Sequence, residues 1–324
     1  MRPPDFWSRP ASGLGGHARV LGLAPLAAIW TLAGRFRRWR TKGARAGIPI
    51  VCIGNVVAGG AGKTPTALAV AARLAAMGRK PVFLSRGHGG RLAGPVLVDP
   101  ALHDAADVGD EPLLLAAAGP AIVARDRVAG AALAAAHGDV VVMDDGFQNP
   151  ALAHDLSLLV VDGDVWFGNG RVIPAGPLRE PLADALSRAD ALLVVGGGRS
   201  LPALPPGAPP VLRARLVPRG DPGLDRKAVV AFAGIGRPEK FFQTLRSLGA
   251  RIVSSHAFGD HQHYTEADLA RLRAEAKRVN AILVTTAKDA ARLSPAAREG
   301  IAVLEIELVP DDPVALGALL RRIR

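Results

Sequence analysis

Two pairs of polar residues carry the chemistry that this sequence can perform. Lys63 and Thr64 end a glycine-rich segment, and Asp144 and Asp145 end an apolar run of valines further along the chain. A lysine and a hydroxyl after small residues are typical of a loop that binds the β- and γ-phosphates of a nucleotide and ligates Mg²⁺. Carboxylates at the tip of a neighbouring strand supply further metal contacts. The two pairs therefore predict a nucleoside triphosphate site that also binds Mg²⁺.

The elements around Lys63 are those that a phosphate-binding loop requires. The apolar run 48–53 predicts a buried strand, and the alanine-rich stretch 66–77 predicts a helix whose N-terminus favours an anion. Val57 departs from the usual pattern G-x-x-x-x-G-K-[ST], because it stands where the first glycine belongs. We expect the phosphates to be bound by Val57, Ala58, Gly59, Gly60, Ala61, Gly62, Lys63 and Thr64.

Asp110 and Glu111 begin a helix-forming stretch, which leaves two roles open for them. Aspartate is a good helix N-cap, and a carboxylate can equally take the proton from a hydroxyl that attacks a phosphate. A later loop places His261 beside Asp260. Because no cysteine or further histidine cluster completes a zinc site there, we expect one of the two histidines of this loop, His261 or His263, to assist a general base, with a solvated, helix-capping loop as the alternative.

A rigid segment (169–180) dense in glycine and proline contains Arg171 and Arg179. Guanidinium groups bind phosphates through paired hydrogen bonds, so both arginines are candidates for a substrate phosphate. A surface crossover explains the same composition. The single cysteine, Cys52, lies in the first predicted strand, where we expect a buried thiol rather than a reactive one.

The positive charge of the chain is concentrated at its N-terminus. Residues 1–47 contribute +8 of the net charge of +11, so no nucleic-acid partner is expected for the nearly balanced remainder. The apolar stretch 21–34 is shorter than the roughly 20 residues that cross a bilayer, and a basic, aromatic stretch (35–42) follows it. This order favours a helix on an anionic membrane surface, with docking on the protein's own core and a secretory signal peptide as alternatives.

Apolar runs and helix-forming stretches alternate along the rest of the chain. Apolar strands between helices predict a mostly parallel sheet covered on both faces, and a Pro/Gly-rich tract then reads as a linker. We expect an α/β protein of the P-loop NTPase type, with a second, smaller α/β domain and an N-terminal membrane-associated helix. Its parts are a membrane-anchoring segment (1–47), a kinase domain (48–200), a linker (201–226) and a C-terminal domain (227–324), which includes one strand over 301–306.

Seven motifs together resemble the tetraacyldisaccharide 4′-kinase family, the lipid A 4′-kinases of Gram-negative bacteria. In chain order from residue 54 to residue 292 they are G-N-x-x-x-G-G-x-G-K-T-P, S-R-G-x-G-G, V-G-D-E-P, D-D-G-F-Q, P-A-G-P-L-R-E, the Asp-His pair 260–261, and T-T-x-K-D-A-x-R. The family's loop also accounts for Val57. The resemblance implies transfer of the ATP γ-phosphate to the 4′-hydroxyl of a tetraacylated glucosamine disaccharide 1-phosphate, at the cytoplasmic face of the inner membrane.

The resemblance also implies roles for individual residues. Asp110 with His261 resembles a base dyad for the sugar hydroxyl, while Lys63 contacts the phosphates. Thr64, Asp144, Asp145 and Glu111 resemble the metal-binding set. The partners implied are the lipid disaccharide and anionic lipids, and no obligate protein partner is expected. A P-loop kinase of a small soluble acceptor and a membrane-associated nucleotide switch remain as alternatives, although the segment 286–289 lacks the asparagine of a guanine-reading N-K-x-D motif.

Overall fold

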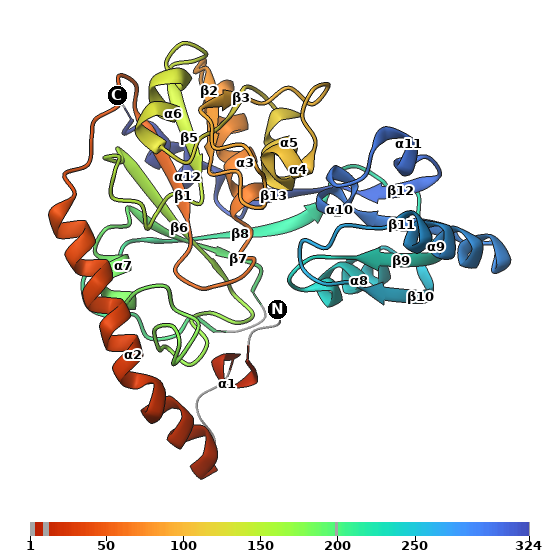
Figure 1. Cartoon of the computed structure of the whole chain (residues 1–324), viewed down its shortest axis with the longest axis horizontal. Coiled ribbons are helices and arrows are strands. Elements are labelled where there is room, and N and C mark those ends of the chain that lie inside the picture. Colours follow the sequence, from red (N-terminus) through yellow and green to blue (C-terminus); the bar gives the residue numbers. More distant parts are fainter. Residues whose placement is uncertain (1–3, 9–12, 198–199, 324) are drawn as a thin grey trace.

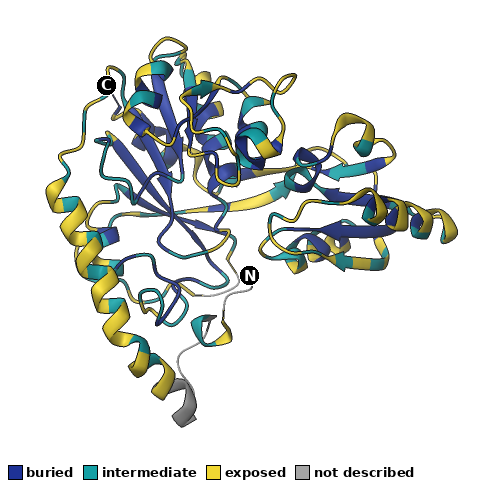
Figure 2. Ribbon diagram, in the orientation of Figure 1, coloured by how far each residue is buried: buried dark blue, intermediate teal, exposed yellow. Residues whose placement is uncertain are grey.

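The computed structural model describes residues 4–8, 13–197 and 200–323, with the backbone alone for residues 8 and 13–17. The chain forms a large lobe and a small lobe, and a long helix lies along the side of the large lobe away from the small one (Figure 1). Buried residues are concentrated in the strands at the centre of each lobe (Figure 2). The predicted α/β class, with a mostly parallel sheet between helices, is confirmed.

Within the described ranges, nine strands form the sheet of the large lobe, in the order β13-β8-β7-β6-β1-β5-β2-β4-β3. Only the two edge pairs, β13 with β8 and β3 with β4, are antiparallel there. The strands are β1 (Ile50–Gly54), β2 (Pro81–Ser85), β3 (Val96–Leu97), β4 (Ala121–Val123), β5 (Val140–Asp144), β6 (Leu156–Asp162), β7 (Ala191–Val195), β8 (Val211–Pro218) and β13 (Ile306–Pro310). Parallel pairing brings the carboxyl ends of β1, β5 and β6 to one edge.

Helices cover both faces of this sheet, as its fully buried central strands require. One face packs against α3 (Lys63–Ala76), α5 (Asp110–Ala116) and α12 (Pro313–Leu320). The other face packs against α6 (Arg127–Ala134) and α7 (Leu182–Leu186), and α4 (Ala105–Val108) leads into α5. Cys52 is fully buried in β1, and burial raises the pKa of its thiol far above the usual range, which is consistent with the predicted structural role.

The small lobe has a parallel sheet of its own, in the order β10-β9-β11-β12. Its strands are β9 (Ala228–Ala233), β10 (Arg251–Ala257), β11 (Ile282–Thr286) and β12 (Ile301–Leu304). One face carries α8 (Pro238–Ser247), and the other carries α9 (Glu266–Arg278). Two short helices, α10 (Ala287–Ala291) and α11 (Pro295–Arg298), follow β11.

The chain connections differ from the expected linker and from the expected strand over 301–306. The tract 201–226 contains β8, which pairs with β7 in the large sheet. The run 301–306 is divided at Glu305, because β12 pairs with β11 of the small lobe whereas β13 pairs with β8. Leu308 of β13 and Leu316 of α12 belong to the core of the large lobe. Two stretches of chain therefore join the lobes, and the C-terminus returns to the large one.

The N-terminal region contains α1 (Asp5–Ser8) and the 28-residue α2 (Gly13–Arg40). Helix α2 contacts the large lobe near α7, but much of its length is exposed (Figure 2). Leu21, Ile29 and Leu32 are 71%, 62% and 63% exposed. Among the helices that the structure describes, none has the length and apolar character to span a bilayer.

Candidate active site

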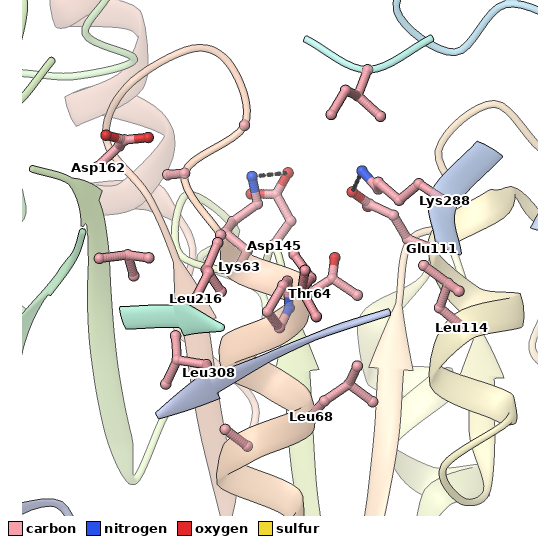
Figure 3. A pocket seen from close by; sticks show the side chains of 18 of the residues that line it. Lys63, Thr64, Leu68, Glu111, Leu114, Asp145, Asp162, Leu216, Lys288 and Leu308 are labelled. Atoms are coloured by element: carbon pink, nitrogen blue, oxygen red, sulfur yellow. Dashed lines mark hydrogen bonds and ion pairs between the residues drawn. The ribbon is translucent and has the colours of Figure 1, made fainter. Parts of the chain in front are cut away.

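Most of the predicted site residues line one cleft of about 2150 Å³, which includes the carboxyl edge of the large sheet. The segment Gly59 to Thr64 lines it from the large lobe, and His261 and Lys288 line it from the small lobe. Asp110 and Asp144 are buried beneath this surface, and each contacts a residue that lines the cleft. Figure 3 shows Lys63 and Thr64 at the start of α3, with Glu111 and Lys288 across the cleft.

The phosphate-binding loop connects β1 to α3. Gly62 precedes α3 with φ 87°, a left-handed conformation that glycine adopts without strain, so Lys63 and Thr64 begin the helix. We expected all eight residues from Val57 to Thr64 to bind the phosphates, but the first two have other contacts. Val57 forms a bridge with Leu178, and the Ala58 N–H donates to the carbonyl oxygen of Pro177 at 2.8 Å. Neither of the two lines the cleft, to which this loop contributes only from Gly59 onward.

Asp144 and Asp145 lie beside this loop because β5 pairs directly with β1, with Asp144 opposite Ile53. The Thr64 hydroxyl donates to Asp144 Oδ2 at 3.0 Å. Burial, together with the negative charge of Glu111, raises the pKa of Asp144 to about 7. Burial also acts on Asp145, but the positive charges of Lys63 and Arg179 outweigh it and lower the pKa of this carboxyl. The pKa values of these two neighbouring carboxyls are therefore shifted in opposite directions.

The residues at the strand tip fit a divalent cation. Asp144 Oδ1 is buried and has no hydrogen-bond partner among the described residues, and an orphaned carboxylate oxygen of this kind is costly without a ligand. Across the same described ranges, no group of three or more His, Cys, Asp or Glu side chains could hold a metal on its own. Mg²⁺ is usually bound by one or two carboxylates together with phosphate oxygens and water. Thr64 and Asp144 match this incomplete protein set.

Asp110 and His261 meet across the cleft, although the large lobe supplies one and the small lobe the other. Asp110 Oδ2 lies 3.2 Å from His261 Nδ1, while Asp110 Oδ1 accepts from the Glu111 N–H at 3.0 Å. The carboxylate therefore bonds the start of α5 and contacts the histidine at once. Gly109 allows the His88 carbonyl group to lie close to the start of α5, because a Cβ at position 109 would lie 2.5 Å from the carbonyl oxygen of His88.

Charges around the pair determine its protonation. Burial raises the pKa of Asp110, but the His261 hydrogen bond and the charges of Lys288 and Arg292 exceed that effect and hold it well below its usual range. The hydrogen bond with Asp110 raises the pKa of His261, against the opposing effects of burial and Lys288. Asp260 Oδ1 lies 3.8 Å from His261 Nε2, and the ring of His88 stacks edge-on to that of His261. Asp110 is thus held ionised beside a more basic histidine.

Arg292 is a central residue of this site to which the sequence alone assigned no role. Its guanidinium group is almost fully buried and donates to Asp110 Oδ2 at 2.7 and 3.0 Å, to the Gly234 carbonyl oxygen at 2.9 Å and to Asp289 Oδ1 at 3.0 Å. In the sequence, only its place as the last residue of the motif T-T-x-K-D-A-x-R pointed to Arg292. Lys288 of the same motif bonds Glu111 at 2.7 Å (Figure 3), so Glu111 is paired with a cation.

A second contact between the lobes lies on the other side of the phosphate-binding loop. Lys240 Nζ bonds Asp162 Oδ2 at 2.6 Å, and Arg237 bonds the same carboxylate. Arg237 also reaches the carbonyl oxygen of Gly60 at 3.5 Å. Sequence patterns did not indicate these residues, because each pair joins segments that are distant along the chain.

The two candidate arginines of segment 169–180 have different positions. Arg179 Nη1 lies 3.0 Å from Asp145 Oδ1 and lines the cleft. Arg171 is exposed and lies outside the cleft lining. Other arginines also line the cleft, among them Arg86, Arg125 and Arg127. Burial and the nearby Arg86 lower the pKa of Arg127 to about 10, so this wall of the cleft is strongly positive.

Comparison with known proteins places the chain among kinases. Residues 19–324 match the family model described as Tetraacyldisaccharide-1-P 4′-kinase. The Tetraacyldisaccharide 4′-kinase of Methylorubrum populi is 53% identical, over 98% of this chain and 97% of that protein. The protein of the same name from Rhodospirillum centenum is 53% identical, over 99% and 96%. The crystal structure of LpxK from Aquifex aeolicus in complex with ATP superposes with a TM-score of 0.77 and 25% identity, covering 94% of this chain and 99% of that chain.

Arg292→Ala should strongly destabilise the protein, because it leaves Asp110 and Asp289 buried without their cation. We expect the free energy of unfolding in urea to fall by about 3–5 kcal/mol. The control is Arg215→Ala, which breaks the exposed pair with Asp311 and should cost no more than about 1 kcal/mol. Equal losses in the two variants would show that the buried ion-pair network does not stabilise the lobe contact.

Proposed function

We propose how the cleft performs phosphate transfer in a chain that belongs to the tetraacyldisaccharide-1-P 4′-kinase family. The protein is an ATP-dependent kinase that phosphorylates the 4′-hydroxyl of a tetraacylated disaccharide 1-phosphate, a step of lipid A biosynthesis. The observation that carries the proposed mechanism is the pair Asp110 and His261. It brings together residues of both lobes at the cleft that the phosphate-binding loop also lines.

In this proposal the triphosphate lies along Gly59 to Thr64, where backbone N–H groups and the start of α3 favour anions. Lys63 is buried and its Nζ lies 3.7 Å from Asp145 Oδ2 (Figure 3), so it can exchange a weak ion pair for the γ-phosphate. Thr64 and Asp144 would hold Mg²⁺, with Asp145 and Glu111 nearby. When bound, Mg²⁺ neutralises charge that develops on the transferred phosphoryl group. It would also favour the ionised form of Asp144.

The dyad removes the proton of the 4′-hydroxyl as that oxygen attacks the phosphorus. Asp110 stays ionised through Arg292 and accepts from His261 Nδ1, which leaves Nε2 as the basic nitrogen of a neutral imidazole. The role of Asp110 is then to fix the ring orientation and to raise its basicity. Two bridges between the lobes, at Asp110 and at Asp162, support a proposal in which the small lobe closes over the bound substrates.

Helix α2 is proposed to lie on the anionic, cytoplasmic surface of the inner membrane. Its support is the exposed apolar side chains of Leu21, Ile29 and Leu32, followed by the basic residues Arg40 and Lys42. Apolar burial combined with attraction to anionic lipids is the usual basis of interfacial binding. Because an acceptor with four acyl chains resides in the bilayer, an enzyme bound to the membrane surface lies close to this substrate. We infer no obligate protein partner.

A single assay tests the proposed function against a soluble-acceptor kinase and a nucleotide switch. With γ-labelled ATP and Mg²⁺, the label should appear on the tetraacyldisaccharide 1-phosphate and should depend on that lipid. Lys63→Ala should reduce the transfer by at least about 100-fold, because the loop loses its main charge for the phosphates. Release of labelled phosphate at the same rate without lipid would instead indicate a switch.

Asp110→Asn and His261→Ala should each lower kcat by about 100- to 10,000-fold, as expected for loss of a general base, while ATP affinity stays near that of the wild type.

The pH profile identifies the basic group. Because Asp110 raises the pKa of His261, activity of the wild type should fall as the pH drops through a value above 6.5, the ordinary histidine pKa. In Asp110→Asn this limb should move to lower pH. An acid limb below pH 4 in the wild type would identify Asp110 itself as the base.

Membrane binding by α2 can be separated from its contacts with the large lobe. Replacing Leu21, Ile29 and Leu32 by serine should reduce binding to vesicles with anionic lipids at least about 10-fold, because the helix loses apolar area that would enter the interface. The matched control is Val314→Ser, which removes a side chain that is 70% exposed on α12. If the triple variant floats with vesicles as well as this control does, another surface binds the membrane.

A further inference from the structure

A chain of polar contacts runs from helix α2 to the strand tip that carries Asp145. Its first member is Glu180, whose carboxylate is only 4% exposed. Arg38 of α2 lies 3.1 Å from Glu180 Oε2, and Arg188 bonds the same oxygen. The other oxygen, Oε1, accepts from Gln148 Nε2 at 3.2 Å. A buried carboxylate with these partners is held in one orientation.

Gln148 connects Glu180 to residues of the active site by hydrogen bonds. Its Nε2 also donates to the carbonyl oxygen of Asn55, at the start of the phosphate-binding loop, at 2.8 Å. Its Oε1 accepts from Arg179 Nη1 at 3.4 Å, and the same Nη1 bonds Asp145 Oδ1 at 3.0 Å. Glu180 is therefore separated from Asp145 by Gln148 and Arg179 alone.

Helix α2 also holds the main chain of Arg179. The Trp30 indole N–H donates to the Arg179 carbonyl oxygen at 2.9 Å, although the Trp30 side chain is largely exposed. On its other side, the Arg179 N–H donates to the carbonyl oxygen of Val56 at 2.7 Å. The backbone of Arg179 thus lies between the phosphate-binding loop and α2, while its side chain contacts Asp145.

The geometry points to Glu180 and Trp30 as positioning residues, through which α2 is a working part of the active site and not only a membrane tether. Resting on the kinase function proposed above, the inference is that they hold the Arg179 guanidinium on Asp145. If Arg179 moved away, Asp145 would lose one of its two cations and pair more strongly with Lys63. Lys63 would then be less available to the γ-phosphate at the moment of transfer.

The test uses full-length Glu180→Gln and Trp30→Phe in neutral-detergent micelles containing saturating lipid acceptor, where binding to an anionic surface has no influence. We expect kcat to fall at least 10-fold for Glu180→Gln and at least 3-fold for Trp30→Phe, with KM for the lipid unchanged. The control is Arg35→Ala, which removes one of the two ion pairs of α2 with Asp184 without touching Glu180 or Arg179, and should keep kcat within 2-fold of the wild type.

A double-variant comparison shows whether Glu180 acts through Arg179. If it does, adding Glu180→Gln to Arg179→Ala should change kcat by less than 2-fold, because the residue being positioned is already absent. A full additional 10-fold loss would overturn the inference. A raised KM for the lipid with unchanged kcat, which is the behaviour of a simple tether, would overturn it too.

Trp30→Phe keeps the inference testable if Glu180→Gln does not fold, since Trp30 is largely exposed and its replacement leaves the core intact. Unchanged kcat in folded Trp30→Phe would then count against the role of α2. The wild type in the same assay separates this inference from the proposed function. Absence of lipid-dependent transfer in the wild type would refute the kinase function, whereas active wild type with unaffected variants would refute the positioning role alone.

Discussion

The active site depends on the neutralisation of four carboxylates that two segments of the large lobe bring to one place. Asp110 is paired with Arg292 and His261, Glu111 with Lys288, and Asp145 with Lys63 and Arg179. Among the described residues, Asp144 alone of the four has no cation within ion-pair distance. Buried charge without a partner is costly, and the raised pKa of Asp144 is its direct consequence. Cations of the protein therefore pair with three of the four carboxylates, and the fourth, Asp144, lies where a divalent cation would bind.

The same ion pairs determine the position of the small lobe relative to the large lobe. Three of the neutralising groups, His261, Lys288 and Arg292, come from the small lobe, and a second pair of cations there reaches Asp162. The return of β13 to the large sheet joins the lobes through a second stretch of chain. A small lobe in another position would leave carboxylates of the large lobe buried and unpaired. The same set of contacts therefore fixes the orientation of the lobes and shifts the pKa values of Asp110 and His261.

Local patterns in the sequence were enough to predict the parts of the site that are local in the structure. The strand, loop and helix around Lys63 and the carboxylates after β5 are of this kind, because adjacent parallel strands bring them together. Asp110 and His261 were associated only through a family resemblance, since no periodicity connects residues in different lobes. Arg292 and Asp162 were missed for that reason. β8 was obscured by flanking proline and glycine, and the change of sheet at Glu305 has no local signal.

Val57 shows why the start of the phosphate-binding loop departs from the usual glycine pattern. At this position the chain does not line the cleft. It pairs with Leu178, and Asn55 Nδ2 donates to the Val57 carbonyl oxygen at 2.6 Å. A β-bridge suits a β-branched residue better than glycine. The first half of the loop is thus bonded to the segment that leads to Arg179, and this segment is bonded in turn to α2. A glycine at position 57 would add freedom where the structure uses the backbone to connect α2 to the loop between β1 and α3.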